Sequence, residues 1–540
     1  MGSGIPKPEP ELLAIALGAI AVSFALMFTG LGGRPFWVDE AIAVLPARSI
    51  LTEGVPRNPF DLNFMAFQLE DGLWDPSAPL YRYSVAAVAA IVGFSETSTR
   101  GWSVALGLVM LAPIYLLFRR LFGGPSALLA VAFVAASPPF ADLAREARHF
   151  TFVACMMAFT FYFLVDAAAT GRERSRALWP VFLVATLLGH AMGYIALPIV
   201  GVFLLLSWRQ PLLSRRHRWL YGGVLALYVG IQAKYGNTLP FLHSIGCENH
   251  IAGCHPEWYY YLGTLANFAT GSPLEIAPGT LIPSPVVGLS NLFLPTVLVL
   301  IGVGATVAGL RGEPEARAGR ILVLAWFLLP ILLLSLSEAK FPRYLVYVLP
   351  PMCLFLAHGL VTLSRAPRLA RVRRPLLATL AVVLILIPQL YDERVAGGGR
   401  RVRFRSRFLS HAFESSLSGE TDNWEHIRAQ TSYLQARVTD GDVVVTSLDD
   451  ASLGYYLGRF VYGFLNSQHD DNFFVGILRE ASRRGGRVWF IDTLPIHNYC
   501  QNKADDPQGV DCRVKYRRFY EACRPESRLF NPACVRVRFD

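Results

Sequence analysis

Charged side chains are scarce in this chain of 540 residues. Asp, Glu, Lys and Arg together make up 17% of it, whereas 53% of the residues are hydrophobic and 12% are aromatic. A soluble domain carries charge on about a quarter of its residues. The shortage of charge therefore excludes an ordinary soluble fold and predicts a polytopic membrane protein.

A cleavage site for a removable signal peptide is also missing. Residues 12–31 are almost wholly apolar and have the length of one helical bilayer crossing, about 20 residues. No small-residue cleavage motif follows them. We therefore expect this first segment to be a retained membrane anchor.

Nucleic acid is excluded as a partner by the distribution of the basic residues, although the net charge is +10. Basic clusters lie between apolar segments, at 119–120, 172–176, 209–218 and 365–374. Such clusters are typical of cytoplasmic loops, which carry more Lys and Arg than loops on the other face. They also favour contact with anionic lipid head groups.

The remaining apolar segments predict a bundle of about eleven to thirteen transmembrane helices. They lie near 80–94, 103–118, 124–138, 152–168, 178–207, 219–236, 289–309, 321–335, 343–363 and 376–392. The segment 178–207 fits either one long helix or two short helices that meet near His190. No internal repeat is recognisable among the segments, which counts against a transporter built from two related halves.

A soluble C-terminal domain is predicted after the glycine-rich stretch at 396–399. Residues 441–447 and 487–492 each read as a buried strand, and residues 472–484 have helical spacing. We expect a membrane part at 1–395, with long loops at 32–78 and 237–288, and a small α/β domain at 396–540. The arginines between 400 and 407 fit either contact with lipid head groups or docking of an anionic glycan acceptor.

Six of the eight cysteines lie outside the apolar segments and predict disulfides. They are Cys247, Cys254, Cys500, Cys512, Cys523 and Cys534. A metal site at Cys247 and Cys254, which three histidines surround, is a weaker alternative because the spacing suits structural zinc poorly. Disulfides place the loop and the C-terminal domain in an oxidising compartment, outside the cytoplasm. Cys155 and Cys353 lie within apolar segments, and we expect both to be unpaired.

An acidic pair, Asp39 and Glu40, follows the first apolar segment closely. A carboxylate at the membrane edge can remove a proton from an acceptor hydroxyl or hold a divalent cation beside a lipid-borne substrate. Solvation at the interface is the alternative interpretation. Two adjacent carboxylates offer few ligands, so Mg²⁺ or Mn²⁺ is a conceivable cofactor but not a required one.

The order of motifs along nearly the whole chain resembles the GT-C superfamily of membrane glycosyltransferases. Within it, the chain is similar to protein O-mannosyltransferases and the lipid A aminoarabinose transferase. The motifs that carry this resemblance are 36–40, 47–54, 78–81, Glu96 with Arg100, 137–138, 145–150, His190, 340–344 and 349–351. Matching points in the C-terminal domain lie at 422–424 and 441–442.

The resemblance implies transfer of one sugar from a polyprenyl-phosphate carrier to an acceptor hydroxyl on an envelope glycan, lipid or protein. It also implies a bacterial inner membrane protein whose active site faces the periplasm. The reaction needs a general base and positive charge for the departing phosphate. We assign the base to Asp39, with Glu40 in support, and expect inversion at the anomeric carbon because one base suffices for a single displacement.

The donor phosphate is expected to meet basic residues of two motifs: Lys340, Arg343, Arg145 and Arg148. Snorkelling toward water is the alternative for Lys340 and Arg343, and an ion pair with Glu146 is the alternative for Arg145. Further candidates for substrate binding are His149, His190 and Tyr344, although packing within the bundle is the favoured interpretation for His190.

One departure concerns the aminoarabinose transferases, which carry an Arg shortly after the acidic pair and a Lys before the first-loop proline. This chain has Ile42 and Val44 after the pair, and Ser77 and Ala78 before Pro79. The acceptor and the sugar therefore stay open. A transporter of lipid-linked sugars and a non-catalytic subunit of envelope assembly are the alternative functions.

Overall fold

The fold is described from a computed structural model of the chain. The described residues are 10–36, 38–56, 78–207, 210–213, 216–217, 219, 221–223, 226, 228–230, 294–312, 314–335, 342–369, 372–386, 390–394, 400–404, 425–446, 450–458, 461–463, 471–493 and 517–539.

The chain divides into two compact units, which are described separately. The first unit comprises Met1–Leu31, Ser77–Tyr81 and Arg100–Glu420. The second unit comprises Gly32–Pro76, Arg82–Thr99 and Thr421–Asp540. The expected boundary near residue 395 lies outside the described residues and stays a prediction.

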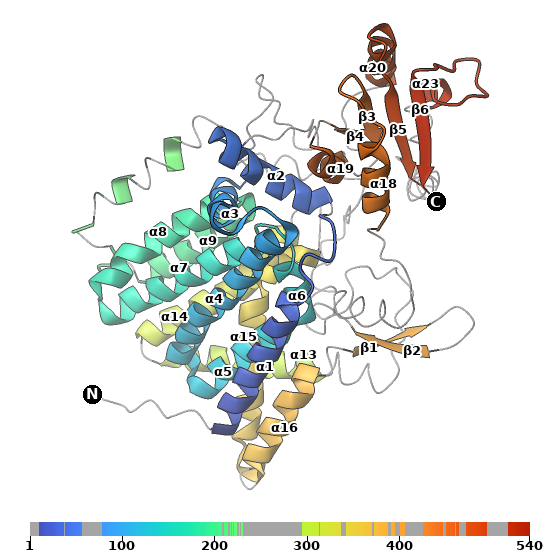
Figure 1. Cartoon of the computed structure of the whole chain (residues 1–540). Helices are drawn as coiled ribbons and strands as arrows, with labels where there is room; N and C mark the ends of the chain where they lie inside the picture. Colours follow the sequence, from blue (N-terminus) through green and yellow to red (C-terminus); the bar gives the residue numbers. More distant parts are fainter. Residues whose placement is uncertain are drawn as a thin grey trace. The chain divides into compact units, whose positions relative to one another are not determined.

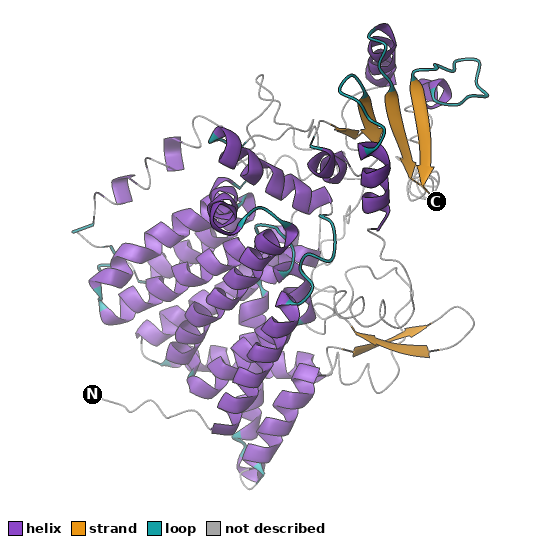
Figure 2. Cartoon of the chain, viewed as in Figure 1, coloured by secondary structure: helices purple, strands orange, loops and turns teal. Residues whose placement is uncertain are grey.

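Helices make up most of the first unit (Figures 1 and 2). The α-helices are α1 (Pro10–Phe28), α4 (Glu96–Phe122), α5 (Gly124–Ala136), α6 (Pro138–Ala144), α7 (Phe150–Thr170), α8 (Glu173–Gly189), α9 (Ala196–Leu206), α13 (Leu294–Ala308), α14 (Pro314–Ser335), α15 (Leu349–Ser364) and α16 (Arg373–Leu386). The 3-10 helices are η2 (Ala191–Ile195), η6 (Gly309–Arg311), η7 (Pro342–Tyr347) and η8 (Pro367–Leu369). An antiparallel pair, β1 (Leu390–Arg394) and β2 (Arg400–Phe404), follows α16.

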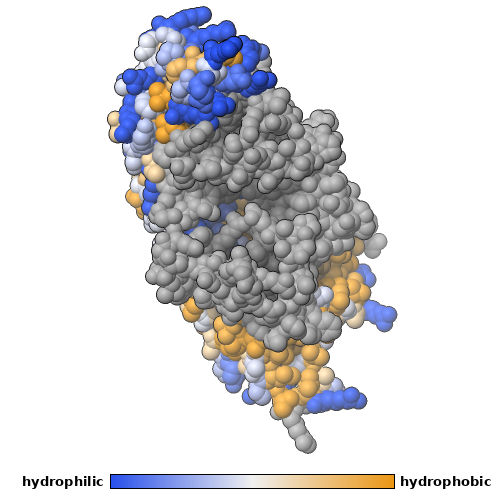
Figure 3. Space-filling view, turned by 90° about the vertical axis from the view of Figure 1, so that its right-hand side faces the viewer, coloured by the Kyte–Doolittle hydropathy of each residue, from blue (hydrophilic) through white to orange (hydrophobic). Residues whose placement is uncertain are grey.

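Several of these helices are long and apolar enough to cross a membrane. Within the described residues there are five such helices, or six if α5 and α6, which meet at 61°, form one broken span. Large apolar side chains on them face outward, and Leu17, Val22, Leu300 and Leu332 are each more than half exposed. Apolar surface is visible in Figure 3. The prediction of a polytopic helical membrane protein is confirmed, while the full number of crossings stays a prediction.

Close packing joins α13 to α15 at two glycines. A Cβ atom at Gly302 would lie 2.0 Å from the carbonyl oxygen of Phe355, and one at Gly359 would lie 1.9 Å from that of Leu298. The two backbones can therefore meet only because neither glycine has a side chain. Small residues serve this purpose at many interfaces between membrane helices, where van der Waals contact drives association.

A buried carboxylate ties three helices together at one end of the first unit. Asp166 on α7 is 2% exposed, forms an ion pair with Arg120 of α4, and accepts a hydrogen bond from Ser175 of α8. Burying a lone carboxylate is costly, so the pair and the hydroxyl offset that cost.

The second unit contains two helices from the N-terminal third of the chain: α2 (Val38–Glu53) and most of α3 (Pro79–Val92). Its C-terminal part contains a parallel sheet with the order β4-β3-β5-β6. Its elements are α18 (Glu425–Gln435), β3 (Val443–Thr446), α19 (Asp450–Leu457), β4 (Val461–Gly463), α20 (Asp471–Arg483), β5 (Val488–Thr493), α23 (Arg517–Ala522) and β6 (Cys534–Phe539). The predicted α/β domain, with its two strands and one helix, is confirmed.

Apolar side chains point alternately to the two faces along the central strands, so this sheet has a core on both faces. Val445 and Phe490 pack in one cluster with residues of α20 and α23. Val444 and Trp489, the preceding residues, pack in another cluster with residues of α18 and α19. Because neighbouring side chains of a strand point to opposite faces, a strand covered on both sides is apolar throughout.

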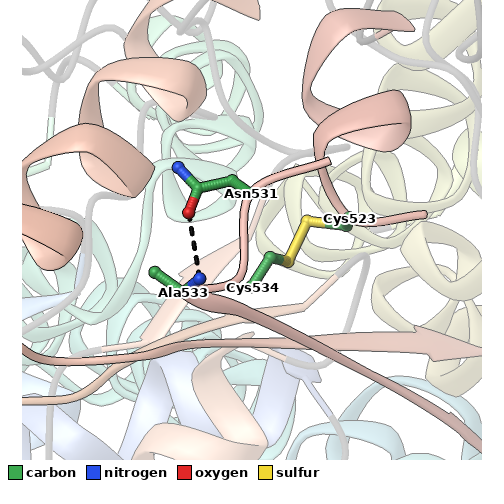
Figure 4. Close-up of a disulfide and its surroundings, with 4 residues drawn as sticks. All are labelled: Cys523, Asn531, Ala533 and Cys534. Atoms are coloured by element: carbon green, nitrogen blue, oxygen red, sulfur yellow. Dashed lines mark hydrogen bonds between the residues drawn. A yellow bond between two sulfur atoms is a disulfide. The ribbon is translucent and has the colours of Figure 1, made fainter. Parts of the chain in front are cut away.

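One of the predicted disulfides is present among the described residues, between Cys523 and Cys534 (Figure 4). It joins the end of α23 to the start of β6, and Asn531 Oδ1 accepts a hydrogen bond from the Ala533 amide in the turn between them. Cys155 and Cys353 are buried and unpaired, as expected. The other four candidate cysteines lie outside the described residues.

Candidate functional site

The acidic pair lies in the first turn of α2, within the second unit. Carboxylates are favourable at this end of a helix, where the backbone N–H groups point outward. Glu40 is 2% exposed, whereas Asp39 is partly exposed. This difference suits the two predicted roles, because a base must reach its substrate and a supporting group need not.

A shared cation fits the pair poorly. Consecutive side chains leave a helix roughly 100° apart, so Asp39 and Glu40 diverge. No cluster of three or more His, Cys, Asp or Glu side chains that could hold a metal occurs in the part of the chain that the structure describes. The pair alone therefore offers Mg²⁺ or Mn²⁺ too few converging ligands.

Arg82 is a candidate that the sequence reasoning missed. It lies in the first turns of α3, next to the motif at 78–81, and is 2% exposed. A buried arginine is costly unless it is paired, so such a residue on an apolar helix has a specific structural or functional role. An isolated arginine at the start of an apolar segment was the signal that could have identified it.

Arg145 caps the C-terminal end of α1. Its Nη1 donates to the carbonyl oxygens of Leu26, Met27 and Thr29 at 3.1, 2.6 and 2.8 Å. Leu26 and Met27 belong to the last turn of α1 and Thr29 follows its end, where carbonyls point outward and a positive charge is favourable. The contact favours a structural role for Arg145, whose predicted role at the phosphate stays a prediction.

Arg148 and His149 follow α6 and form a basic and aromatic cluster in the first unit. The guanidinium of Arg148 lies 4.7 Å from the ring centroid of Phe150. His149 is 6% exposed, and its ring stacks on that of His190 with centroids 3.4 Å apart and planes 8° apart. The ring of Tyr81 packs edge to face with the ring of His149, and their centroids are 6.4 Å apart. The structure thus brings three of the predicted site residues together: Arg148, His149 and His190.

His190 occupies the break between α8 and η2, so residues 178–207 form two helices rather than one. Its Nδ1 accepts a hydrogen bond from the Met192 amide at 3.1 Å. The glycines near the break leave no room for a side chain. A Cβ at Gly189 would lie 2.9 Å from the Phe152 ring, and one at Gly193 would lie 2.1 Å from the Thr186 carbonyl oxygen. The turn can therefore bring His190 onto α7.

The 3-10 helix η7 contacts α6 and α7, the helices on either side of Arg148 and His149. Tyr344, a predicted substrate-binding residue, is partly exposed on it. The carbonyl of Tyr347 accepts a hydrogen bond from the indole of Trp326 at 2.7 Å, which anchors η7 to α14. Arg343 belongs to η7, but its side chain, like Lys340, lies outside the described parts of the chain.

The chain has relatives of known family among sequenced proteins. Residues 76–232 match the family described as dolichyl-phosphate-mannose-protein mannosyltransferase. The undecaprenyl phosphate-alpha-4-amino-4-deoxy-L-arabinose arabinosyl transferase of Pseudomonas aeruginosa is 25% identical over 389 residues, which are 69% of this chain. The chain spans 64% of the length of that relative.

Two solved structures share the fold. One is ArnT from Cupriavidus metallidurans bound to undecaprenyl phosphate, with a TM-score of 0.54 and 14% identity over 82% of this chain and 85% of that chain. The other is the oligosaccharyltransferase of Archaeoglobus fulgidus, with a TM-score of 0.53 and 12% identity over 85% of this chain and 66% of that chain. In sequence and in fold, the chain is therefore similar to the membrane glycosyltransferases of the GT-C superfamily, as its motifs predict.

Proposed function

We propose that the protein is a glycosyltransferase that moves one sugar from a polyprenyl-phosphate donor to an acceptor hydroxyl. The observation that carries this proposal is the similarity over 389 residues to transferases named for an undecaprenyl-phosphate sugar. The partial exposure of Asp39 beside the buried Glu40 supports it, because a general base needs access to the acceptor.

In the proposed reaction, Asp39 takes the proton of the acceptor hydroxyl as the oxygen attacks the anomeric carbon. The bond from that carbon to the phosphate oxygen breaks, and the polyprenyl phosphate leaves with both bonding electrons. A single displacement of this kind inverts the anomeric centre and needs no second carboxylic acid. The acceptor class we propose is a glycan, lipid or protein of the cell envelope.

Negative charge grows on the departing phosphate, so positive groups near it lower the barrier. We propose Arg148 as a ligand of this phosphate, because its guanidinium lies over Phe150 and thus has a set orientation. Arg343 and Lys340 are proposed as further ligands of the phosphate because their motif supplies two cations. The 3-10 helix η7, to which Arg343 belongs, packs on the helices that flank Arg148. His149, His190 and Tyr344 are proposed to contact the substrate.

We further propose that the C-terminal domain and the active site face the periplasm. The disulfide between Cys523 and Cys534 supports this orientation, because such bonds persist in oxidising compartments and are rare in the cytosol.

Transfer from a panel of radiolabelled polyprenyl-phosphate sugars to a membrane extract tests the proposal. Wild type should transfer label from at least one donor, and Asp39→Asn should lower turnover by roughly two to four orders of magnitude while donor binding changes little. Glu53→Gln, which removes a carboxylate at the other end of α2, is the matched control and should stay active. Full activity of Asp39→Asn would remove Asp39 from the role of base. Movement of labelled lipid across proteoliposomes without any transfer would refute the glycosyltransferase proposal.

A further inference from the structure

The C-terminal domain contacts the segment that leads into α2, within the second unit. The hydroxyl of Tyr456, on α19, accepts a hydrogen bond from the Phe36 amide at 2.7 Å and donates one to Glu96 Oε1 at 2.6 Å. Phe36 lies three residues before Asp39, and Glu96 is in the first turn of α4. One hydroxyl therefore joins three parts of the chain that are far apart in sequence.

Aromatic packing surrounds this hydroxyl. The ring of Phe36, which is fully buried, meets the ring of Tyr455 edge to face with centroids 5.0 Å apart. The ring of Phe94 lies 6.2 Å from Tyr455, and the guanidinium of Arg48, from α2 itself, lies 5.7 Å from it. The two adjacent tyrosines of α19 thus contact residues before α2, on α2 and before α4.

A second polar contact holds the same segment. Arg428 of α18 donates from Nη2 to the carbonyl oxygen of Gly33 at 2.6 Å. The C-terminal domain therefore holds the segment 33–36 at both ends, through a carbonyl and an amide. The carbonyl oxygen of Tyr456 accepts a hydrogen bond from Gln435 of α18, which links the two contacting helices to each other.

The charge-assisted bond to Glu96 is of the stronger kind, and it fixes the direction of the hydroxyl. With its proton directed at the carboxylate, the oxygen of Tyr456 presents a lone pair to the Phe36 amide. Burial and the bond to Glu96 raise the pKa of Tyr456 above its usual range, so the hydroxyl stays protonated at neutral pH.

From these contacts we propose that Tyr456 of the C-terminal domain is a positioning residue, which holds the start of α2 and thereby the orientation of Asp39. This inference rests on the proposed function of Asp39 for its catalytic consequence. A general base must be held within a fraction of an ångström of its productive place, and small displacements lower turnover strongly. The domain thus has a structural role at the proposed base, Asp39.

Tyr456→Phe in the full-length protein tests the inference, because it removes the bridging hydroxyl and keeps the ring. Tyr455→Phe is the matched control, because no hydrogen bond of the Tyr455 hydroxyl is found among the described residues. Hydrogen exchange followed by mass spectrometry on peptides that cover residues 33–45 reports directly on the contact. We expect exchange in Tyr456→Phe to be about fivefold faster or more, and unchanged in the control.

Turnover gives the second measurement. Tyr456→Phe should lower kcat about tenfold to a hundredfold, with little change in the KM for the donor, since the donor contacts are not altered. Glu96→Ala should act in the same way, and Glu96→Gln should largely restore activity because the amide oxygen still accepts the Tyr456 proton. Combining Tyr456→Phe with Glu96→Ala should add little, as expected for two residues of one network.

Unchanged exchange in Tyr456→Phe would overturn the inference, whatever the turnover. Faster exchange with unchanged kcat would also overturn it, because the segment would then not matter to the reaction. Absence of transfer by wild type is a different result: it would refute the proposed function and with it the catalytic role of Tyr456, while the exchange data would still decide whether Tyr456 holds this segment.

Discussion

Alanine at Gly302 should separate α13 from α15 and destabilise the first unit. The added Cβ would lie 2.0 Å from the Phe355 carbonyl oxygen, whereas an ordinary contact is about 3.5 Å, so the backbones must move apart by roughly 1.5 Å. Overpacked sites typically lose about 1–3 kcal/mol. We expect the upper end of that range, because the opposing atom belongs to a backbone and cannot rotate away.

Gly304→Ala is the matched control on the same helix. Among the described residues, and apart from the neighbouring backbone of α13, nothing lies within 4 Å of a Cβ at Gly304. Alanine should therefore be neutral there or stabilise α13 by up to about 1 kcal/mol, since glycine is a poor helix former. The two substitutions add the same methyl group two residues apart, so any difference between them reports on the contact with α15.

The apparent midpoint of thermal unfolding in detergent, followed by tryptophan fluorescence at one heating rate, measures the effect. We expect Gly302→Ala to lose roughly 5 °C relative to Gly304→Ala. Gly302→Ala should also weaken donor binding. It displaces α15, which follows η7 in the chain, and η7 carries residues proposed to bind the substrate. Equal midpoints for the two variants would refute the close packing of the helices.

Three further predictions concern charge and orientation. Asp442 accepts hydrogen bonds from two backbone amides, the Thr439 hydroxyl and the Trp489 indole; burial alone would raise its pKa, but these bonds lower it overall. A depressed folded pKa means stability that is present above the unfolded value, about 3.9, and is lost as the pH falls through the folded value. Hydrogen exchange of β3 and β5 should therefore show that Asp442→Asn destabilises the sheet at pH 6 but progressively less toward pH 3; a pH-independent difference would contradict this. Arg148→Ala should weaken binding of a polyprenyl phosphate about tenfold with a small change in thermal midpoint, whereas Arg145→Ala should mainly lower the midpoint; the reverse pattern would move the phosphate site to Arg145. Alkylation before and after reduction of protein from its native membrane should find Cys523 and Cys534 oxidised, and reactive thiols at both positions would argue against a periplasmic domain.

Local patterns were enough to predict much of the architecture. The strands at β3 and β5 and the helix α20 lie where apolar runs and helical spacing indicate them, because burial on both faces of a parallel sheet leaves a continuous apolar stretch. The membrane class follows from composition alone. Helices that cross lipid satisfy their backbone hydrogen bonds internally and need apolar side chains, whatever the exact order of those side chains.

Residue roles were less predictable from the sequence. The basic motif around Arg145 predicts a phosphate ligand, and that role stays a prediction. Its contact with the end of α1, a helix that ends more than 100 residues earlier, was not predictable from the motif. Arg82 is buried although nothing but its place in an apolar helix marks it. Charge type and spacing indicate which chemistry a side chain can perform, but its partners are set by packing.

Residue types and their spacing are enough to predict the class of protein, the GT-C resemblance, the acidic pair and the approximate elements of the C-terminal domain. Three features needed the folded chain: the break of residues 178–207 at His190, the pairing of Cys523 with Cys534, and the hydrogen bond from the Phe36 amide to Tyr456, 420 residues away. Secondary structure and membrane insertion depend mainly on neighbouring residues, whereas stacking, disulfide pairing and bridging hydrogen bonds depend on which distant surfaces fit together.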